Sequence, residues 1–501
     1  MKNKLFILLA AFVLSVTSCN DWLDVKPGTE QTTDIMFESY QGYKDALTGC
    51  YMKMKQRAIY GENLTMTTVE YLAQHWDLER GYSGTTADAL KRWDYEDDNV
   101  KGTLQNIYAG LYNVIIQANS ILLAMPETGK KAIENNAARE IIEGEALAIR
   151  AFCHFDVLRL FGQMPSGAQK QVRLPYSEEV SREPVSYYDY NAFVGKIEDD
   201  LLKAEKLLES DPFIIYDRNT VNALGATPGL VTDEYLRYRP LRLNYWAVKA
   251  LQARFYLYTG KPEKAYTAAM AVINAENQDG ARKFTLQTIT SSTTNYALPD
   301  EGLFVLNSIQ MSDYIPTLFY RIGTSLIYLY MSPTKLASTE MFGEPVASSS
   351  NNRYRYLWDH ERKNMYNEAC PVLLKYDQTD VTTLSASVQM LSRQIIPLFR
   401  LSEMYLIAME TSSEALTEVN TLYETYRLAR DILGTTFTSK EQVMEMIIKE
   451  YRREFFGEGQ MFYTYKRMRA NRMLWTTDAN TTVTESAYVI PLPTTEFDPN
   501  L

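Results

Sequence analysis

Residues 244–275 read NYWAVKALQARFYLYTGKPEKAYTAAMAVINA, and this stretch is the clearest pointer to the fold. Apolar and small side chains recur at three- and four-residue steps on both sides of Gly260, which is the spacing of an amphipathic α-helix. Small residues such as Ala250 and Ala268 suit positions where two helices touch, and the glycine suits the turn between them. The stretch therefore predicts two helices packed as a hairpin.

Helical periodicity extends to both sides of this hairpin. Segments 138–162 and 396–430 repeat its arrangement loosely, at irregular spacing. We therefore predict a mostly α fold of tetratricopeptide-like hairpins wrapped into one scaffold, rather than a regular solenoid. The individual helices are expected at about 104–122, 138–161, 190–209 and 441–470, the last interrupted at Gly457 and Gly459.

The stretch 276–395 is different, because Ser, Thr, Asn, Tyr and Pro alternate there with little period. A long irregular insertion on a rigid scaffold usually carries binding groups. Its apolar run 303–306 and Trp358 argue against a disordered linker. We expect an N-terminal part of about 19–275, a ligand-binding insertion of about 276–395 and a C-terminal helical part of about 396–501.

Composition places the chain among globular proteins and disfavours some partners. Of its 501 residues, 46% are hydrophobic and 23% charged. Lys and Arg number 51 against 62 Asp and Glu, which gives a net charge of −11, and no basic run occurs. Nucleic-acid binding needs clustered cations, so such a partner is not expected. Three scattered histidines are too few for most zinc chemistry, and no metal is predicted.

The first 18 residues have the pattern of a secretory signal. Lys2 and Lys4 precede an apolar run at 5–16, and small residues follow. The sequence Val-Thr-Ser-Cys at 16–19 resembles a bacterial lipobox, in which Cys19 would receive a diacylglyceryl group. The alternative is an ordinary signal peptide with an incidental cysteine. Since we find no other apolar stretch of about 18 residues, the lipid is expected to provide the membrane anchor.

Signatures of catalysis and of cofactor binding are absent from the sequence. It contains no phosphate-binding loop, dinucleotide fingerprint, zinc-protease motif or nucleophile elbow. The acidic residues at 94–98 lack the turn glycine and final glutamate of a calcium loop, so a solvated turn is preferred. Cys50, Cys153 and Cys370 have no redox or zinc spacing. A glycosidase that uses two of the 62 acidic residues is not excluded.

Five motifs, in order along the chain, carry a family resemblance. They are Asp-Trp-Leu-Asp at 21–24 behind Cys19, Glu143–Gly162, Arg400–Glu410, Glu450–Gly459 and Ile490–Leu501. In this combination the chain resembles the SusD/RagB family of Bacteroidetes outer-membrane lipoproteins from Cys19 to Leu501. It departs from the family pattern at Tyr451 and Gln460, which lie in predicted scaffold.

The resemblance implies a surface-exposed, lipid-anchored binding protein that is not an enzyme. Such proteins deliver ligands to a SusC-like, TonB-dependent transporter in the outer membrane; the ligands are usually glycans and in some members peptides. No cofactor is implied. The charged residues of the motifs are expected to form buried or interhelix ion pairs: Arg150, Glu403, Arg452, Arg453 and Glu454.

Aromatic residues suggest where a ligand binds. The chain has 36 Tyr against 19 Phe, an excess typical of rings that keep one edge in water. We expect an oligosaccharide to stack on flat rings in two irregular regions, 74–82 and 310–360. The residues expected to contact it are Trp76, Tyr82, Tyr314, Tyr320 and Trp358, whereas Trp93 and Trp246 are assigned to the core. A peptide ligand is the main alternative, and a carboxylate-based glycoside hydrolase the less favoured one.

Overall fold

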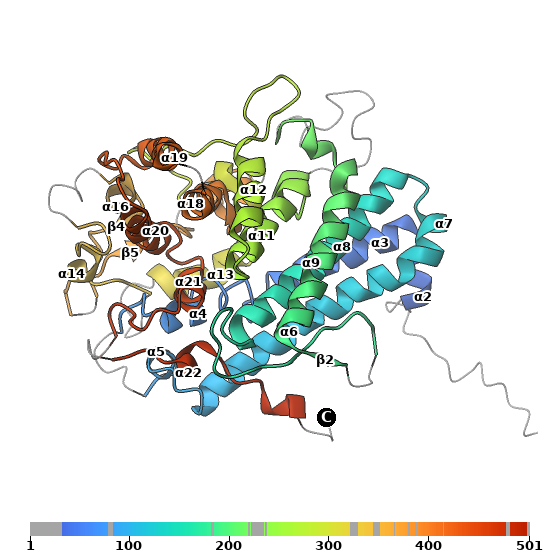
Figure 1. Ribbon diagram of the computed structural model, residues 1–501, viewed down its shortest axis with the longest axis horizontal. Helices are drawn as coiled ribbons and strands as arrows, with labels where there is room; N and C mark the ends of the chain where they lie inside the picture. Colours follow the sequence, from blue (N-terminus) through green and yellow to red (C-terminus); the bar gives the residue numbers. More distant parts are fainter. Residues whose placement is uncertain are drawn as a thin grey trace, which may run out of the picture.

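The computed structural model confirms the mostly α fold, with helices in both halves and only short strands (Figure 1). The described residues are 33–78, 84–181, 185–218, 221, 235, 238–320, 329–343, 351–364, 366–378, 381–385, 389–413, 415–476 and 481–497. The signal region and Cys19 therefore lie outside the described residues.

The N-terminal half is a bundle built around one central helix, α8. Every residue of α8 from Gly144 to Phe161 is buried, and the helix packs against its three neighbours α3, α6 and α9. A helix that is buried on all sides has no solvent-facing polar side, and the charged residues in this part of α8 are accordingly paired, as in Arg150–Asp200 and Arg159–Asp156. The bundle helices are α3 (Tyr40–Met54), α6 (Asp98–Ala124), α8 (Asn136–Phe161) and α9 (Tyr190–Leu207).

Side-chain caps fix where two of these helices begin. Asp97 Oδ1 accepts hydrogen bonds from Asn99 N at 2.9 Å and Val100 N at 3.0 Å at the start of α6. Asn135 caps α8 in the same way. Such caps satisfy amide groups that the first helical turn leaves unpaired. Part of the acidic stretch 94–98 therefore serves as a helix cap.

The run Asp98–Ala132, which contains α6, is long and apolar enough to cross a membrane by length and composition, since an 18-residue window within it has a mean hydropathy of 1.4. This corrects the expectation that no apolar stretch of that length follows the signal region. In the structure, α6 packs along α3 and α8, and residues such as Val100, Leu111 and Ile121 are buried. The run is therefore a core helix of the bundle.

The hairpin predicted from 244–275 is present as α11 (Tyr245–Tyr258) and α12 (Pro262–Ile273). Gly260 turns the chain between them at a φ of 73°, where a side chain would be strained. The Asn244 side chain accepts from Ala247 N at 3.0 Å and so begins the first helix. The later helices are α18 (Leu401–Thr411), α19 (Leu416–Arg430), α20 (Lys440–Glu454) and α21 (Met461–Arg467). Helix α18 packs against the hairpin, α19 and α20 pack against α18, and α21 packs against α20.

The segment 396–430 differs from its prediction at its start. Residues Ile395–Arg400 form a strand, β6, which pairs antiparallel with β3 (Gly302–Asn307), with Val305 opposite Pro397. All six residues of β6 are buried. A short, fully apolar run has the same appearance in a buried strand and in a buried helix, which explains the difference.

The described residues of the insertion contribute to the main hydrophobic core together with the helices. Two small antiparallel pairs complete the strands, β1 (Leu174–Pro175) with β2 (Tyr187–Tyr188) and β4 (Trp358–Asp359) with β5 (Val372–Leu373). The remaining α-helices are short: α2 (Thr33–Met36), α4 (Thr68–Leu72), α5 (Thr86–Lys91), α7 (Lys130–Ala132), α13 (Met311–Ile315), α14 (Pro333–Leu336), α16 (Asn352–Tyr356) and α22 (Glu485–Tyr488).

The expected ion pairs of the family-like motifs are confirmed. Arg150 pairs with Asp200 at 2.6 Å, and Arg254 with Glu403 at 2.6 Å. Arg452 pairs with Glu340 at 3.0 Å and Arg453 with Glu450 at 2.9 Å. Glu454 contacts three arginines, Arg353, Arg400 and Arg430. The Arg453–Glu450 pair lies within α20, and the other pairs join helices to each other, to β6 or to the insertion.

Candidate functional site: a cleft between two loop regions

The two regions predicted to bind ligand meet in the structure. Asp77 N donates to Tyr330 O at 3.1 Å, and Ser332 N donates to Asp77 Oδ2 at 2.6 Å. The ring of Trp76 lies edge-on to Phe319, with 5.9 Å between the centroids. The segment 74–78 and the insertion therefore pack directly against each other.

Buried lysines hold the 74–77 segment in place. Lys335 Nζ donates to the carbonyl oxygens of Gln74 at 2.8 Å and His75 at 2.6 Å. Lys91 Nζ donates to Trp76 O at 2.8 Å. Burial lowers the pKa of Lys335 to about 7 and that of Lys91 to about 8. The segment is thus fixed by contacts from two distant parts of the chain.

Three of the five aromatic residues predicted to stack on a sugar are covered. Trp76 is 0% exposed, Trp358 4% and Tyr314 6%. Trp76 Nε1 donates to Met66 O at 2.7 Å, and Phe456 packs against both indoles. A covered ring cannot stack on a ligand, so the structure corrects the expectation of open rings at these three positions.

Tyr82 and the side chain of Tyr320 lie outside the described part of the chain. Ligand contact by these two residues therefore stays a prediction.

Trp93 and Trp246 are half-buried against the core, and their indole nitrogens donate to Leu72 O and Phe213 O.

A cleft of about 400 Å³ opens between the insertion and the segments 62–71 and 86–90, which flank the predicted region 74–82 in the sequence, and we call it the Tyr71 cleft. Its volume lies within the ~300–1,000 Å³ typical of small-molecule sites. One wall comes from α4, α5 and the loop before α4, and the other from the insertion. The residues that line it include Glu62, Asn63, Thr67, Tyr71, Leu318 and Leu329.

Tyr71 supplies a free hydroxyl to this cleft. Its hydroxyl has no hydrogen-bond partner among the described residues. Burial, and after it the Glu62 carboxylate, raises the pKa of Tyr71. The hydroxyl therefore stays protonated at neutral pH and can donate to a ligand oxygen.

The other polar groups of the cleft are neutral or already paired. Thr67 Oγ1 donates to Asn63 Oδ1 at 3.2 Å, and Thr68 Oγ1 donates to the same oxygen at 2.9 Å. Glu62 pairs with Arg57 at 2.6 Å. Hydroxyl and amide groups beside Leu318 and Leu329 suit a ligand that alternates apolar faces with hydroxyls.

The cleft contains little that could perform chemistry. Among the described lining residues Glu62 is the one carboxylate, whereas glycosidases use two. Within the described ranges no group of three or more His, Cys, Asp or Glu is placed to hold a metal. Cys50, Cys153 and Cys370 are buried, and burial raises the pKa of Cys50 to about 12.

Sequence reasoning did not single out Tyr71, Asn63 or Thr67. A signal was present, because the threonines at 65, 67 and 68 and Tyr71 come just before the predicted segment 74–82. The helix α4 has five residues, which is too short for periodicity to show which side chains face outward. Their position at a cleft follows only from the packing of the insertion against them.

Comparison with known families gives two matches that together run from residue 21 to 491. Residues 21–257 match a family described as "Starch-binding associating with outer membrane", and residues 244–491 match the SusD family. A SusD-like protein from Formosa agariphila is 25% identical over 170 residues, which is 33% of this chain and 31% of that relative. The alignment thus spans about a third of that relative.

Several solved structures have the same fold over most of the chain. A SusD superfamily protein from Bacteroides thetaiotaomicron has a TM-score of 0.68 at 19% identity, covering 92% of this chain and 98% of that one. A SusD-like carbohydrate binding protein from Bacteroides vulgatus has a TM-score of 0.60 at 16% identity, covering 86% and 83%. A laminarin binding SusD-like protein has a TM-score of 0.61 at 18% identity, covering 92% and 97%.

Proposed function

Because this chain belongs to the SusD/RagB family, we propose that it is a cell-surface lipoprotein that captures oligosaccharide and passes it to a SusC-like, TonB-dependent outer-membrane transporter. The observation that carries this proposal is the pair of family matches across residues 21–491, one of them described as starch-binding and associated with the outer membrane. Anchoring through Cys19 is part of the same proposal.

We place ligand capture at the Tyr71 cleft. Its threonine, amide and tyrosine groups are suited to sugar hydroxyls, and its leucines to the apolar face of a sugar ring. Tyr82 and Tyr320, which belong to the same two regions of the sequence, are proposed as further contacts.

Binding is tested by isothermal titration of the protein with neutral oligosaccharides, including maltohexaose and laminarihexaose. Tyr71→Phe removes one hydroxyl and should weaken binding about 5- to 10-fold, the effect of losing one hydrogen bond. The matched control is Tyr366→Phe, since Tyr366 is exposed and does not line the cleft. Unchanged affinity of Tyr71→Phe would place the ligand elsewhere.

The same incubations test whether the protein acts on its ligand. We expect no new reducing ends after incubation with the oligosaccharide panel, because the protein is proposed to bind without cleavage. Product above the blank would favour a hydrolase. Binding of oligopeptides, with no response to any sugar, would instead favour the peptide-binding alternative.

The transporter partner is tested by co-purification from detergent-solubilised outer membranes, using a tag after Leu501. We expect a TonB-dependent transporter to be recovered with the protein. Because this protein would have to open and close over the transporter barrel, the interface between the two should be broad and mixed in polarity. Recovery of the protein alone, under conditions that preserve membrane complexes, would argue for a free-standing binder.

A further inference from the structure

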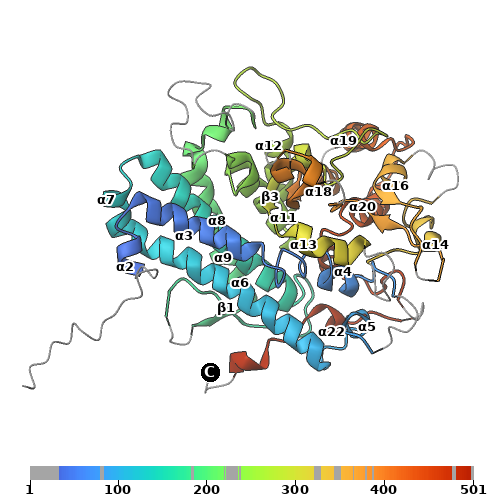
Figure 2. The ribbon, with the colours of Figure 1, turned by 180° about the vertical axis from the view of Figure 1, so that it is seen from behind.

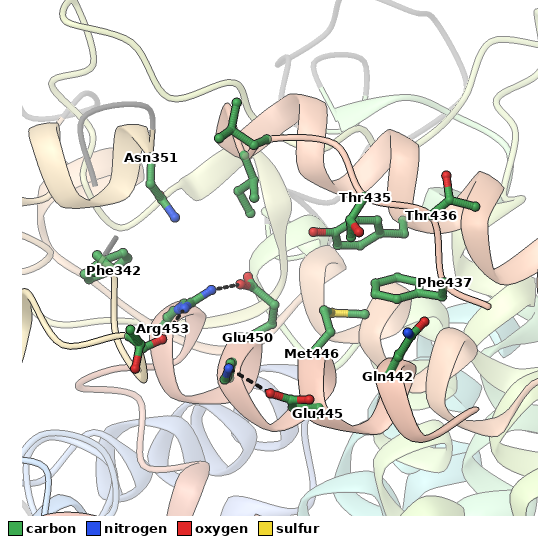
Figure 3. Close-up of a pocket in the computed structure, with 16 residues that line it drawn as sticks. Phe342, Asn351, Thr435, Thr436, Phe437, Gln442, Glu445, Met446, Glu450 and Arg453 are labelled. Carbon is green, nitrogen blue, oxygen red and sulfur yellow. Dashed lines mark hydrogen bonds and ion pairs between the residues drawn. The ribbon is translucent and has the colours of Figure 1, made fainter. Parts of the chain in front are cut away.

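A second pocket, of about 450 Å³, lies between the α19–α20 pair and the insertion (Figure 3). We call it the Asn351 pocket, and its lining includes Phe342, Asn351, Tyr423, Phe437, Met446 and Arg453. None of its described lining residues also lines the Tyr71 cleft. The two hollows are therefore separate.

Two aromatic rings form an apolar wall of this pocket. Tyr423 and Phe437 are in contact, with 4.7 Å between ring centroids and 58° between their planes. Asn420 holds Phe437 in place, because its side chain accepts from Phe437 N at 2.8 Å and donates to Phe437 O at 3.0 Å. Met446 extends the apolar wall (Figure 3).

Asn351 directs an unused donor into the pocket. The residue is 5% exposed, and its Oδ1 accepts from Arg353 N at 3.1 Å and from Arg353 Nε at 3.3 Å. Both of those groups are donors, so the amide oxygen must face them and the nitrogen must face away. Figure 3 shows the amide nitrogen pointing into the pocket, and it has no partner among the described residues.

Tyr423 provides a second donor. Its hydroxyl makes no hydrogen bond within the described ranges, although the residue is largely buried. Burial, followed by the effect of Glu450, raises the pKa of Tyr423 to about 12, so the hydroxyl keeps its proton at neutral pH. Both Asn351 and Tyr423 therefore offer a donor to oxygen atoms of a ligand in the pocket.

The charges around the pocket favour a neutral ligand. Lys449 pairs with Glu445 at 3.0 Å, and Arg453 pairs with Glu450 at 2.9 Å. Each cation thus has a carboxylate beside it. An anionic ligand would have to displace these pairs and approach two carboxylates, which like-charge repulsion disfavours.

We propose that the Asn351 pocket is a second carbohydrate subsite, which binds one end of a neutral oligosaccharide. Sugar hydroxyl oxygens accept from Asn351 Nδ2 and the Tyr423 hydroxyl, and the apolar face of a ring lies against Phe437 and Met446. This inference rests on the proposed glycan binding and adds a site that is distinct from the Tyr71 cleft.

Two conservative variants test the subsite. Asn351→Asp keeps the acceptor that holds Arg353 but replaces the free donor with an acceptor oxygen, and Tyr423→Phe removes only a hydroxyl. Wild-type protein, both variants, Tyr71→Phe and the control Tyr366→Phe are titrated with maltohexaose, laminarihexaose and the anionic oligogalacturonate. Thermal melting checks that each variant is folded. If Asn351→Asp does not fold, the titration of Tyr423→Phe alone tests the subsite.

We expect the wild type to bind a neutral probe at two sites. Asn351→Asp and Tyr423→Phe should each weaken binding at the Asn351 pocket by about 10-fold, the effect of one lost hydrogen bond. Tyr71→Phe should weaken only the other site, and oligogalacturonate should not bind the pocket. Pocket variants that titrate like the wild type would overturn the subsite while leaving the proposed function intact. No binding of any neutral probe would overturn both.

Discussion

Glu454 is a buried carboxylate held by three guanidinium groups. It lies 2.7 Å from Arg400, 2.8 Å from Arg430 and 2.8 Å from Arg353. Burial alone would raise the pKa of Glu454, but Arg430, Arg400 and Arg353 together lower it well below its ordinary value. The carboxylate therefore stays charged and joins α20 to α19, to β6 and to the insertion.

Glu454→Gln should destabilise the protein by about 3–5 kcal/mol, because it leaves buried guanidinium groups without full compensation. Chemical denaturation measures the change. The control is Glu209→Gln, since Glu209 forms an exposed pair with Lys206 and contributes little. A Glu454→Gln protein as stable as this control would show that the arginines find other partners.

His154 is fixed in its neutral form by hydrogen bonds at both ring nitrogens. Nε2 accepts from Ser177 N at 3.0 Å, so Nδ1 carries the proton and donates to Arg150 O at 3.0 Å. Burial lowers the pKa of His154 well below its ordinary value. Protonation of Nε2 would remove an acceptor in the core.

This arrangement predicts acid sensitivity. In the unfolded chain His154 binds a proton near pH 6.5, whereas in the folded protein it stays neutral. The free energy of unfolding therefore keeps the full contribution of His154 above about pH 6.5. It decreases as the pH falls below that value, by up to ~1.4 kcal/mol per pH unit. Urea denaturation from pH 7 to 5 should show a steeper loss of stability for the wild type than for His154→Gln. Parallel curves would contradict the assignment.

At the scale of elements, the break between α20 and α21 depends on Gly459. Its φ is +71°, and its amide donates to Glu70 Oε1 at 2.7 Å. A Cβ atom there would lie 2.2 Å from Leu64 O. The break lets the C-terminal helices pack against the loop before α4, which also lines the Tyr71 cleft.

Gly459→Ala should destabilise the protein by at least about 1–2 kcal/mol from its left-handed φ alone, with a further cost from moving the Leu64 carbonyl. The control is Gly195→Ala inside α9, where a Cβ meets nothing within 4 Å. That change should be neutral or stabilise by up to ~1 kcal/mol. Equal melting temperatures for the two variants would refute the role of Gly459.

Across the whole molecule, hydrogen bonds join residues that are far apart in the sequence. Lys466 Nζ donates to the Arg159 and Gly162 carbonyls at 2.9 and 2.7 Å, and Tyr95 donates to Ala487 O at 2.6 Å. The C-terminal α22 accordingly lies beside α5 in both views (Figures 1 and 2). The three parts expected from the sequence should therefore fold together.

A chain of residues 19–275 alone should fail to fold, because it lacks β3, β6 and Glu403, the partner of Arg254. Circular dichroism during urea denaturation would show no cooperative transition for this fragment, whereas the 19–501 chain should show one. A cooperative transition in the fragment would mean that the N-terminal bundle is an independent domain.

Cys19 is predicted to determine where the protein works. Cys19→Ala removes the only acyl acceptor that the signal offers, so the protein should become soluble or remain uncleaved. The wild type should be digested by protease added to whole cells. Full protection in intact cells, together with digestion in lysed cells, would place it on the periplasmic side and contradict ligand capture at the surface.

Most of the long helices, the α11–α12 hairpin, the ion-pairing residues and the family could be predicted before the structure, whereas α3 and the short helices were not predicted. The predicted features depend on local periodicity and on motifs that are continuous in the chain. The folded structure was needed to show that residues 395–400 form a strand, that Trp76 and Trp358 are covered, and that Tyr71 and Asn351 carry free donors. The physical reason is that burial depends on residues distant in sequence: Phe456 covers both indoles, and Arg353 orients the Asn351 amide.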